Sequence, residues 1–227
     1  MIVVLAEKPS VARELAQVLG ASSRRDGYYE GQGYRVTWAV GHLVALAQPD
    51  EIDMNWKLWA RDTLPMLPQK FPLKVLETGR GQYRVVERLL RARETTGVIA
   101  ATDAGREGEL IFRLIYEHSG CTRPWQRLWL ASMTEDAIRT AFSKLEPGTR
   151  YDGLAAAARA RSEADWLVGM NLSRAYTLTG GALYTVGRVQ TPTLAMVVGR
   201  DAEIRSFKPQ PYLEIEATFE GRSGAYK

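Results

Sequence analysis

The sequence is poor in cysteine and in long apolar runs. Cys121 is the only cysteine among 227 residues, which excludes a disulfide framework and a cysteine-type zinc site and favours a reducing compartment. The first apolar run, residues 2–6, is followed directly by Glu7, and no later run approaches the length of a membrane span. We therefore expect no signal peptide, no contact with a membrane and a cytoplasmic location.

A strong excess of charge is also lacking, since the formal net charge is only +4 at pH 7. This mildly basic balance is compatible with a nucleic-acid partner but does not establish one. Hydrophobic residues make up 45% of the 227 residues, enough to bury a sizeable core. The composition therefore indicates a globular protein with one large or two small domains, and it leaves the oligomeric state open.

A cluster of acidic residues follows one short apolar segment. Residues 98–101 are too few for a helix and predict a buried strand. Asp103 comes just past this strand, and Glu107 and Glu109 open the next helix. The helix dipole and a pair with Arg113 one turn later would explain Glu109, but they do not explain Asp103. The alternative is a metal or phosphate site, at the strand ends where α/β proteins gather ligands.

The start of the chain repeats this pattern. Residues 2–6 predict a second strand, and Glu7 stands at its carboxyl end. If the two strands are parallel neighbours, Glu7, Asp103 and Glu107 converge on one edge of the sheet. Carboxylate oxygens arranged in this way are how proteins hold Mg²⁺ beside phosphates. Lys8 adds a cation for the same phosphate.

Several segments resemble a known family. AEKPSVAREL at residues 6–15 and ATDAGREGE at residues 101–109 resemble the Toprim domain of type IA DNA topoisomerases. WAVGHLVALAQP (38–49), RSEADWLVGMNLSRAYT (161–177) and TVGRVQTPTL (185–194) resemble the topoisomerase III branch of that family. The resemblance covers nearly the whole chain. It implies an α/β fold, in which a Rossmann-like Toprim domain with a central, mostly parallel sheet precedes a mainly helical DNA-binding domain.

The resemblance also implies roles for the acidic residues. Glu7 would be the acid or base near the attacked phosphate, Lys8 would stabilise the charge of that phosphate, and Mg²⁺ would be the cofactor. The family turn usually reads Asp-x-Asp-x-Glu, whereas Gly105 replaces the middle carboxylate here. We therefore predict a Mg²⁺ ion held by Glu7 and Asp103, with Glu107 as a third ligand or a close neighbour.

A second set of residues is similar to the family's contacts with single-stranded DNA. Trp59 and Trp166 would offer surfaces for stacked bases, and Arg174 would offer a fork for phosphate. A core tryptophan and a plain ion pair between Arg161 and Asp165 are the ordinary alternatives. The predicted DNA-binding residues are Trp59, Arg161, Asp165, Trp166, Arg174, Thr185, Val186, Gly187, Arg188, Val189 and Gln190.

Residues 185–190 precede a helix that we expect Thr191 and Pro192 to begin. The free amides at a helix start, together with Arg188 and Gln190, form a ready phosphate site. This segment is therefore the one that we most expect against the DNA backbone.

The chain is expected to have three parts. These are the Toprim domain at 1–145, a helical domain that binds single-stranded DNA at 146–206, and at 207–227 a linker with the first strand of a truncated further domain. Residues 212–220 alternate apolar and polar side chains, which predicts a half-buried strand, and a lone strand is not stable by itself. The family's nucleophilic tyrosine lies in a Tyr-x-Arg-Thr-Asp setting that no tyrosine has here. The nucleophile and the remaining gate domains would therefore lie in a missing part of the same polypeptide.

The expected function is that of the N-terminal fragment of a type IA topoisomerase of the III branch. Such a fragment would bind single-stranded DNA and supply the acidic Mg²⁺ site for strand cleavage and religation. One alternative is a binding module that holds single-stranded DNA without catalysis. The other is a Toprim nuclease, which would cut DNA with Mg²⁺ and would need no further domain.

Overall fold

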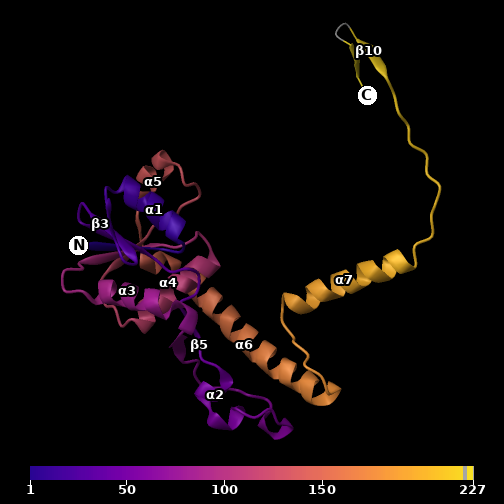
Figure 1. Cartoon of the computed structure of the whole chain (residues 1–227), viewed down its shortest axis with the longest axis horizontal. Coiled ribbons are helices and arrows are strands. Elements are labelled where there is room, and N and C mark those ends of the chain that lie inside the picture. Colours follow the sequence, from indigo (N-terminus) through magenta and orange to yellow (C-terminus); the bar gives the residue numbers. More distant parts are fainter. Residues whose placement is uncertain (222–223, 227) are drawn as a thin grey trace. The chain divides into compact units, whose positions relative to one another are not determined.

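A computed structural model describes residues 1–221 and 224–226. By its internal contacts the chain divides into two compact units, Met1–Val186 and Gly187–Lys227, which are described separately (Figure 1). Within the described residues, no helix is both long enough and apolar enough to span a membrane. The acidic residues that the sequence singles out all lie in the first unit.

A seven-stranded mixed sheet forms the centre of the first unit, in the order β2-β3-β4-β1-β7-β8-β9. β1 pairs in parallel with β4 and β7, and β7 pairs in parallel with β8. The strands toward both edges are antiparallel to their neighbours. The predicted α/β class is confirmed, with the parallel strands at the centre. The strands are β1 (Ile2–Ala6), β2 (Ser23–Arg25), β3 (Tyr28–Gly31), β4 (Tyr34–Trp38), β7 (Gly97–Ala101), β8 (Trp125–Arg127) and β9 (Glu146–Pro147).

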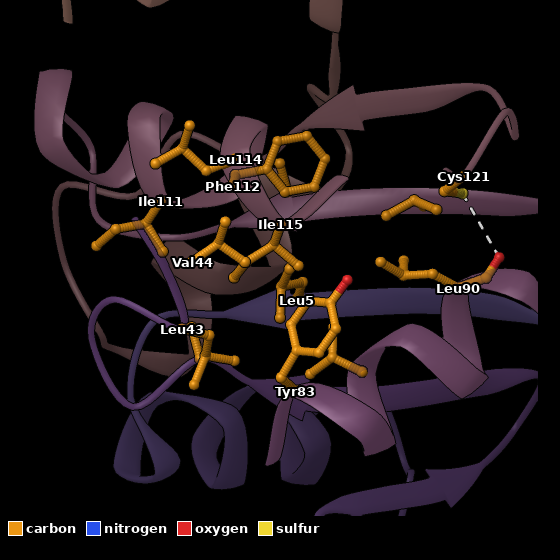
Figure 2. Close-up of a cluster of buried hydrophobic side chains, with 14 of the residues drawn as sticks. Leu5, Leu43, Val44, Tyr83, Leu90, Ile111, Phe112, Leu114, Ile115 and Cys121 are labelled. Atoms are coloured by element: carbon orange, nitrogen blue, oxygen red, sulfur yellow. Dashed lines mark hydrogen bonds between the residues drawn. The ribbon is translucent and has the colours of Figure 1, made fainter. Parts of the chain in front are cut away.

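Helices cover both faces of this sheet because its central strands are apolar on both sides. Val3 and Leu5 of β1 belong to one core with α3 and α4, whereas Val4 and Ala6 belong to another with α1 and α5. Figure 1 shows these two pairs of helices on opposite sides of the sheet, and Figure 2 shows side chains of the first core. The helices are α1 (Pro9–Val18), α3 (Arg80–Arg91), α4 (Arg106–His118) and α5 (Glu135–Phe142).

The segment between β5 and β6 forms a small lobe with a core of its own. Leu46, Met66 and Trp166 are buried together in this core. Trp166 comes from the long helix α6, so this helix closes the lobe. The elements are β5 (Val44–Leu46), α2 (Pro49–Ile52), β6 (Leu73–Val75) and α6 (Asp152–Gly180), with short 3-10 helices at Met54–Trp56, Arg61–Thr63, Glu77–Gly79 and Gly148–Tyr151.

Helix α6 has 29 residues and an alanine-rich first half, which favours a helix. Its first half packs on α4, where Ala158 enters the first core. Farther along, Asn171 exchanges two hydrogen bonds with the main chain of Met66, at 2.6 and 3.0 Å. The helix ends at Gly180 and is capped by Gly181, whose φ of 71° lies in the left-handed region that favours glycine. These contacts pack α6 against the rest of the first unit along most of the helix.

The second unit contains the helix α7 (Gln190–Arg205) and a hairpin of β10 (Phe219–Gly221) and β11 (Gly224–Tyr226). The strand predicted over residues 212–220 is wrong for residues 212–218, because β10 begins only at Phe219. The side chains of Leu213 and Ile215 are exposed, and in the described chain no neighbouring strand covers this stretch. The predicted domain boundaries at 145 and 206 stay predictions.

Candidate functional site

Two strand ends bring Glu7 and Asp103 together. β1 and β7 are parallel and place Ala6 opposite Ala101, so the residues after each strand lie at the same edge of the sheet. The main-chain amide of Asp103 donates a hydrogen bond to Glu7 Oε2 at 3.1 Å. The side chain of Glu7 is 12% exposed and that of Asp103 is 51% exposed. One carboxylate is therefore largely enclosed, and the other faces solvent beside it.

Lys8 lies between these carboxylates. Its Nζ donates to Asp103 Oδ2 at 2.9 Å and lies 4.0 Å from Glu7 Oε1. The hydrogen bond to Asp103, helped by the negative charges of both carboxylates, raises the pKa of Lys8 above its usual value. The ammonium group of Lys8 thus bonds one oxygen of the Asp103 carboxylate and lies close to Glu7.

Glu107 points elsewhere. Its Oε1 lies 2.7 Å from His42 Nε2, and both side chains are exposed. Within residues 1–221 and 224–226, no three His, Cys, Asp or Glu side chains are close enough together to hold a metal ion. The three-carboxylate convergence expected from the sequence is therefore not formed, because Glu107 is paired with His42. The pairing of His42 with Glu107 was not predicted from the sequence.

The chemistry of the two remaining carboxylates fits Mg²⁺. This ion prefers oxygen ligands and is often bound through one or two carboxylates plus substrate phosphates and water. Glu7 and Asp103 supply such oxygens at one edge, and Asp103 is open to solvent. Lys8 would have to leave Asp103 for both oxygens of that carboxylate to serve as ligands. Glu7 and Asp103 are thus the residues that would hold the ion.

The two glycines of the acidic turn have different roles. A Cβ at Gly108 would lie 2.1 Å from the carbonyl oxygen of Asp103, so the first turn of α4 can approach the Asp103 main chain only without a side chain. A Cβ at Gly105 would meet nothing within 4 Å, and Gly105 has an extended φ of 171°. Gly108 is therefore required by packing, whereas the space beside Gly105 is open.

Sequence reasoning missed a buried charge below this edge. Arg127, the last residue of β8, is fully buried, and its guanidinium donates hydrogen bonds to main-chain carbonyls of the Asp103 turn. Its Nε lies 3.2 Å from Oε2 of Glu109, which is also fully buried. The sequence did offer a signal for this buried charge, because Arg127 stands in a strand-like segment directly before Leu128.

Trp166 lies in the core of the lobe rather than on the surface. Its side chain is buried, the ring of Phe71 packs edge-on against it, and its Nε1 donates to the carbonyl of Ala47 at 2.9 Å. The free indole face expected from the sequence is wrong, because the ring is enclosed by these neighbours. Direct contact between Trp166 and DNA stays a prediction that would require the core to open.

Arg174 is also buried, and its guanidinium is engaged within the protein. Nη1 donates to the carbonyl of Trp56 at 2.6 Å, and the guanidinium carbon lies 5.2 Å from the centroid of the Trp59 ring. Burial lowers the pKa of Arg174 from its usual value. One nitrogen of the phosphate fork expected here is thus engaged within the protein, whereas the Trp59 side chain remains 42% exposed. Contact of Arg174 with DNA stays a prediction. The structure brings these two predicted residues together and leaves Trp59 as the accessible one.

The other predicted DNA-binding residues lie apart from the acidic edge. Arg161 and Asp165 are exposed on α6, one turn apart. In the first unit, Thr185 is exposed, and the amide of Val186 donates to Ser173 Oγ at 2.9 Å. In the second unit, the segment Gly187–Gln190 leads into α7, and the amide of Gly187 donates to Thr191 Oγ1 at 3.1 Å. Contact of Arg188, Val189 and Gln190 with DNA stays a prediction.

Comparisons with known proteins give matches along most of the chain. A family model described as the Toprim domain matches residues 2–133, and one described as DNA topoisomerase matches residues 149–227. The chain is 48% identical over 215 residues to DNA topoisomerase 3 of Bacillus thuringiensis strain Al Hakam, covering 95% of this chain and 30% of the relative. It is 46% identical over 219 residues to DNA topoisomerase 3 of Bacillus subtilis strain 168, covering 96% of this chain and 30% of the relative.

The fold also has a counterpart among solved structures. Full-length topoisomerase I from Thermotoga maritima superposes with a TM-score of 0.62 at 22% identity, covering 92% of this chain and 31% of that chain. At this identity the likeness concerns the fold alone. The chain spans about a third of the length of these proteins.

Proposed function

We propose that this chain, which belongs to the Toprim-domain family of type IA DNA topoisomerases, is the N-terminal part of a topoisomerase III and supplies its acidic metal site. The observation that carries the proposal is the pairing of Glu7 and Asp103 at neighbouring parallel strand ends, with Lys8 between them. Toprim domains generally bind a divalent metal, and the relatives named DNA topoisomerase 3 give DNA as the substrate.

The proposed roles follow from the position of each group. Glu7 is largely enclosed and accepts the Asp103 amide, so its carboxyl is placed to give a proton to a leaving oxygen or to take one back. Lys8 carries a positive charge that would stabilise the attacked phosphate. Mg²⁺ bound by Glu7 and Asp103 would supply further positive charge for the same phosphate. The nucleophilic tyrosine is proposed to lie in another part of the enzyme.

The proposed path for single-stranded DNA runs over exposed groups. Trp59 is the accessible aromatic ring, held from below by Arg174, and an exposed indole is a stacking surface for an unpaired base. Arg161 on α6 is exposed and would contact phosphate. Residues 185–190 are proposed to lie against the DNA backbone.

Calorimetric titration with Mg²⁺ tests the metal site. Wild type should bind the ion, and Asp103→Asn, which keeps the size of the side chain but removes its charge, should lose most of the affinity. Glu107→Gln should lose less, because Glu107 is paired with His42. Asp136→Asn, on the exposed first turn of α5, is the matched control and should leave the affinity unchanged. Equal affinities of wild type and Asp103→Asn would refute the proposed site.

Fluorescence anisotropy with a single-stranded oligonucleotide tests the DNA path. Arg161→Ala should weaken binding and reduce the slope of affinity against salt by about one. Arg139→Ala removes another exposed charge, on α5, and should have little effect. Trp59→Ala should weaken binding about tenfold, the scale of one lost base stack. Binding that is indifferent to Arg161 and Trp59 would place the DNA elsewhere.

A further inference from the structure

A complete guanidinium group is buried directly beneath the proposed metal site. Arg127 is fully enclosed and is among the largest side chains of the chain to be so. Arginine is rarely buried completely unless it is paired, and burial lowers the pKa of Arg127 from its usual value, an effect that Glu109 opposes. A charged group buried at such a cost of desolvation needs an opposite charge and hydrogen-bond partners for its N–H groups.

The hydrogen bonds of Arg127 all go to the end of β7 and to the turn that carries Asp103. Nη1 donates to the carbonyls of Ala100 at 3.0 Å and Thr102 at 2.9 Å, and to Thr102 Oγ1 at 3.2 Å. Nη2 donates to the carbonyl of Asp103 itself at 2.7 Å. The Thr102 hydroxyl donates in turn to the carbonyl of Gly108 at 2.7 Å. The Arg127 side chain thus bonds the carbonyls on both sides of the Asp103 α-carbon and fixes the main chain there.

Glu109 provides the opposite charge that makes this burial possible. Its Oε2 lies 3.2 Å from Arg127 Nε, although the two atoms are not aligned for a hydrogen bond. Its other oxygen accepts from Arg113 Nε at 2.8 Å, and Arg113 Nη2 reaches Asp152 at 2.8 Å. On the outer side, the ring of Trp129 lies 5.3 Å from the Arg127 guanidinium carbon. The guanidinium is therefore held from several directions.

We infer that Arg127 is a positioning residue of the metal site, because its guanidinium, neutralised by Glu109, fixes the main chain of Asp103 and so sets the Asp103 carboxylate beside Glu7. This inference rests on the proposed role of Asp103 as a metal ligand. Arg127 itself is fully buried and has no access to metal or DNA.

The test compares Arg127→Lys with wild type by two measurements on the whole chain. Lysine keeps the charge but cannot bond three carbonyls with one planar group. The first measurement needs no metal and is the hydrogen exchange of the Asp103 amide, which donates to Glu7. The second is calorimetric affinity for Mg²⁺. We expect faster exchange at Asp103 with unchanged exchange in β1 and α1, and a loss of affinity of roughly 10- to 100-fold, the usual effect of removing such a supporting group.

Arg139→Lys, a surface substitution on α5, is the matched control and should change neither measurement. If Arg127→Lys fails to fold, Glu109→Gln replaces it, since it keeps the volume and removes only the neutralising charge; the same two effects are expected. A lower melting temperature with unchanged Asp103 exchange and unchanged Mg²⁺ affinity would overturn the inference. Equal affinity of wild type and Asp103→Asn would refute the proposed function instead, and the exchange rates would still decide whether Arg127 orders this turn.

Discussion

Lys8 Nζ bonds one oxygen of the Asp103 carboxylate, so it would compete with a metal ion proposed to bind there. We predict that Lys8→Ala raises the affinity for Mg²⁺ by roughly two- to fivefold, the range for loss of an exposed ion pair. Lys144→Ala, at another exposed lysine, is the control. The measurement is calorimetric titration, and a lower affinity of Lys8→Ala would contradict this competition.

The pKa of Lys8 sets the pH range of this effect. The bond to Asp103 raises that pKa above its usual value, so the ammonium stays charged throughout the neutral and mildly alkaline range. On the alkaline side, the bond to Asp103 is lost only as the pH rises through the raised pKa of Lys8. The difference between wild type and Lys8→Ala should therefore persist from neutral to mildly alkaline pH.

Gly105 is the position where the sequence departs from the family's acidic turn, and the structure has room there. A side chain would meet no atom within 4 Å of its Cβ, and the backbone is extended. We predict that Gly105→Asp folds normally and raises Mg²⁺ affinity on the order of tenfold, because a third carboxylate adds attraction for a doubly charged ion. Gly105→Asn has the same shape without the charge and should bind like wild type. Equal affinities of the Asp and Asn variants would show that position 105 does not face the ion.

At this scale the sequence was informative about which residues meet and less so about side-chain direction. The meeting of Glu7 and Asp103 follows from two strand ends, which any parallel pairing brings together. The turn of Glu107 toward His42 depends on a rotamer and on a loop far away in the sequence, so periodicity could not reveal it. Trp166 likewise bonds a residue that is far away in the sequence, the carbonyl of Ala47, so its burial could not be predicted from the local pattern.

Helix α4 packs closely on the acidic turn because Gly108 has no side chain. A Cβ there would lie 2.1 Å from Asp103 O. Although alanine favours helices by about 1 kcal/mol over glycine, we predict that Gly108→Ala destabilises the fold by about 1–3 kcal/mol, the usual cost of overpacking. Gly153→Ala in α6, where a Cβ meets nothing, should stabilise by up to about 1 kcal/mol. Urea unfolding measures both, and the same sign for both variants would contradict the argument.

Among the elements, those with strong local signals were predicted and those that depend on distant partners were not. β1, β7 and α4 have apolar patterns and clear boundaries, and the structure has them close to the expected residues. Residues 212–218 alternate well but have no neighbouring strand in the described chain to receive their backbone hydrogen bonds. Alternation alone therefore gave a strand that does not form.

At the scale of the whole molecule, the first unit combines the acidic edge with the helix proposed to bind DNA. Arg113 of α4 bonds Glu109 at 2.8 Å and Asp152 of α6 at 2.8 Å. The same α4 begins just after Asp103. The first turn of α6 and the proposed metal site thus both contact helix α4. This helix would hold a DNA strand bound along α6 at a fixed distance from the metal.

The contacts of α6 lead to a prediction about truncation. Ala158 packs in the first core and Trp166 closes the lobe, so residues 1–186 should fold as one cooperative unit. The side chains of Leu194, Met196 and Val197 in α7 are more than half exposed, and a single helix of this length is marginal alone. We predict that residues 1–186 melt within about 2 °C of residues 1–227. Residues 1–145, which lack α6, should melt much lower or without cooperativity. Thermal unfolding followed by circular dichroism decides, and a marked loss in 1–186 would mean that residues 187–227 stabilise the first unit.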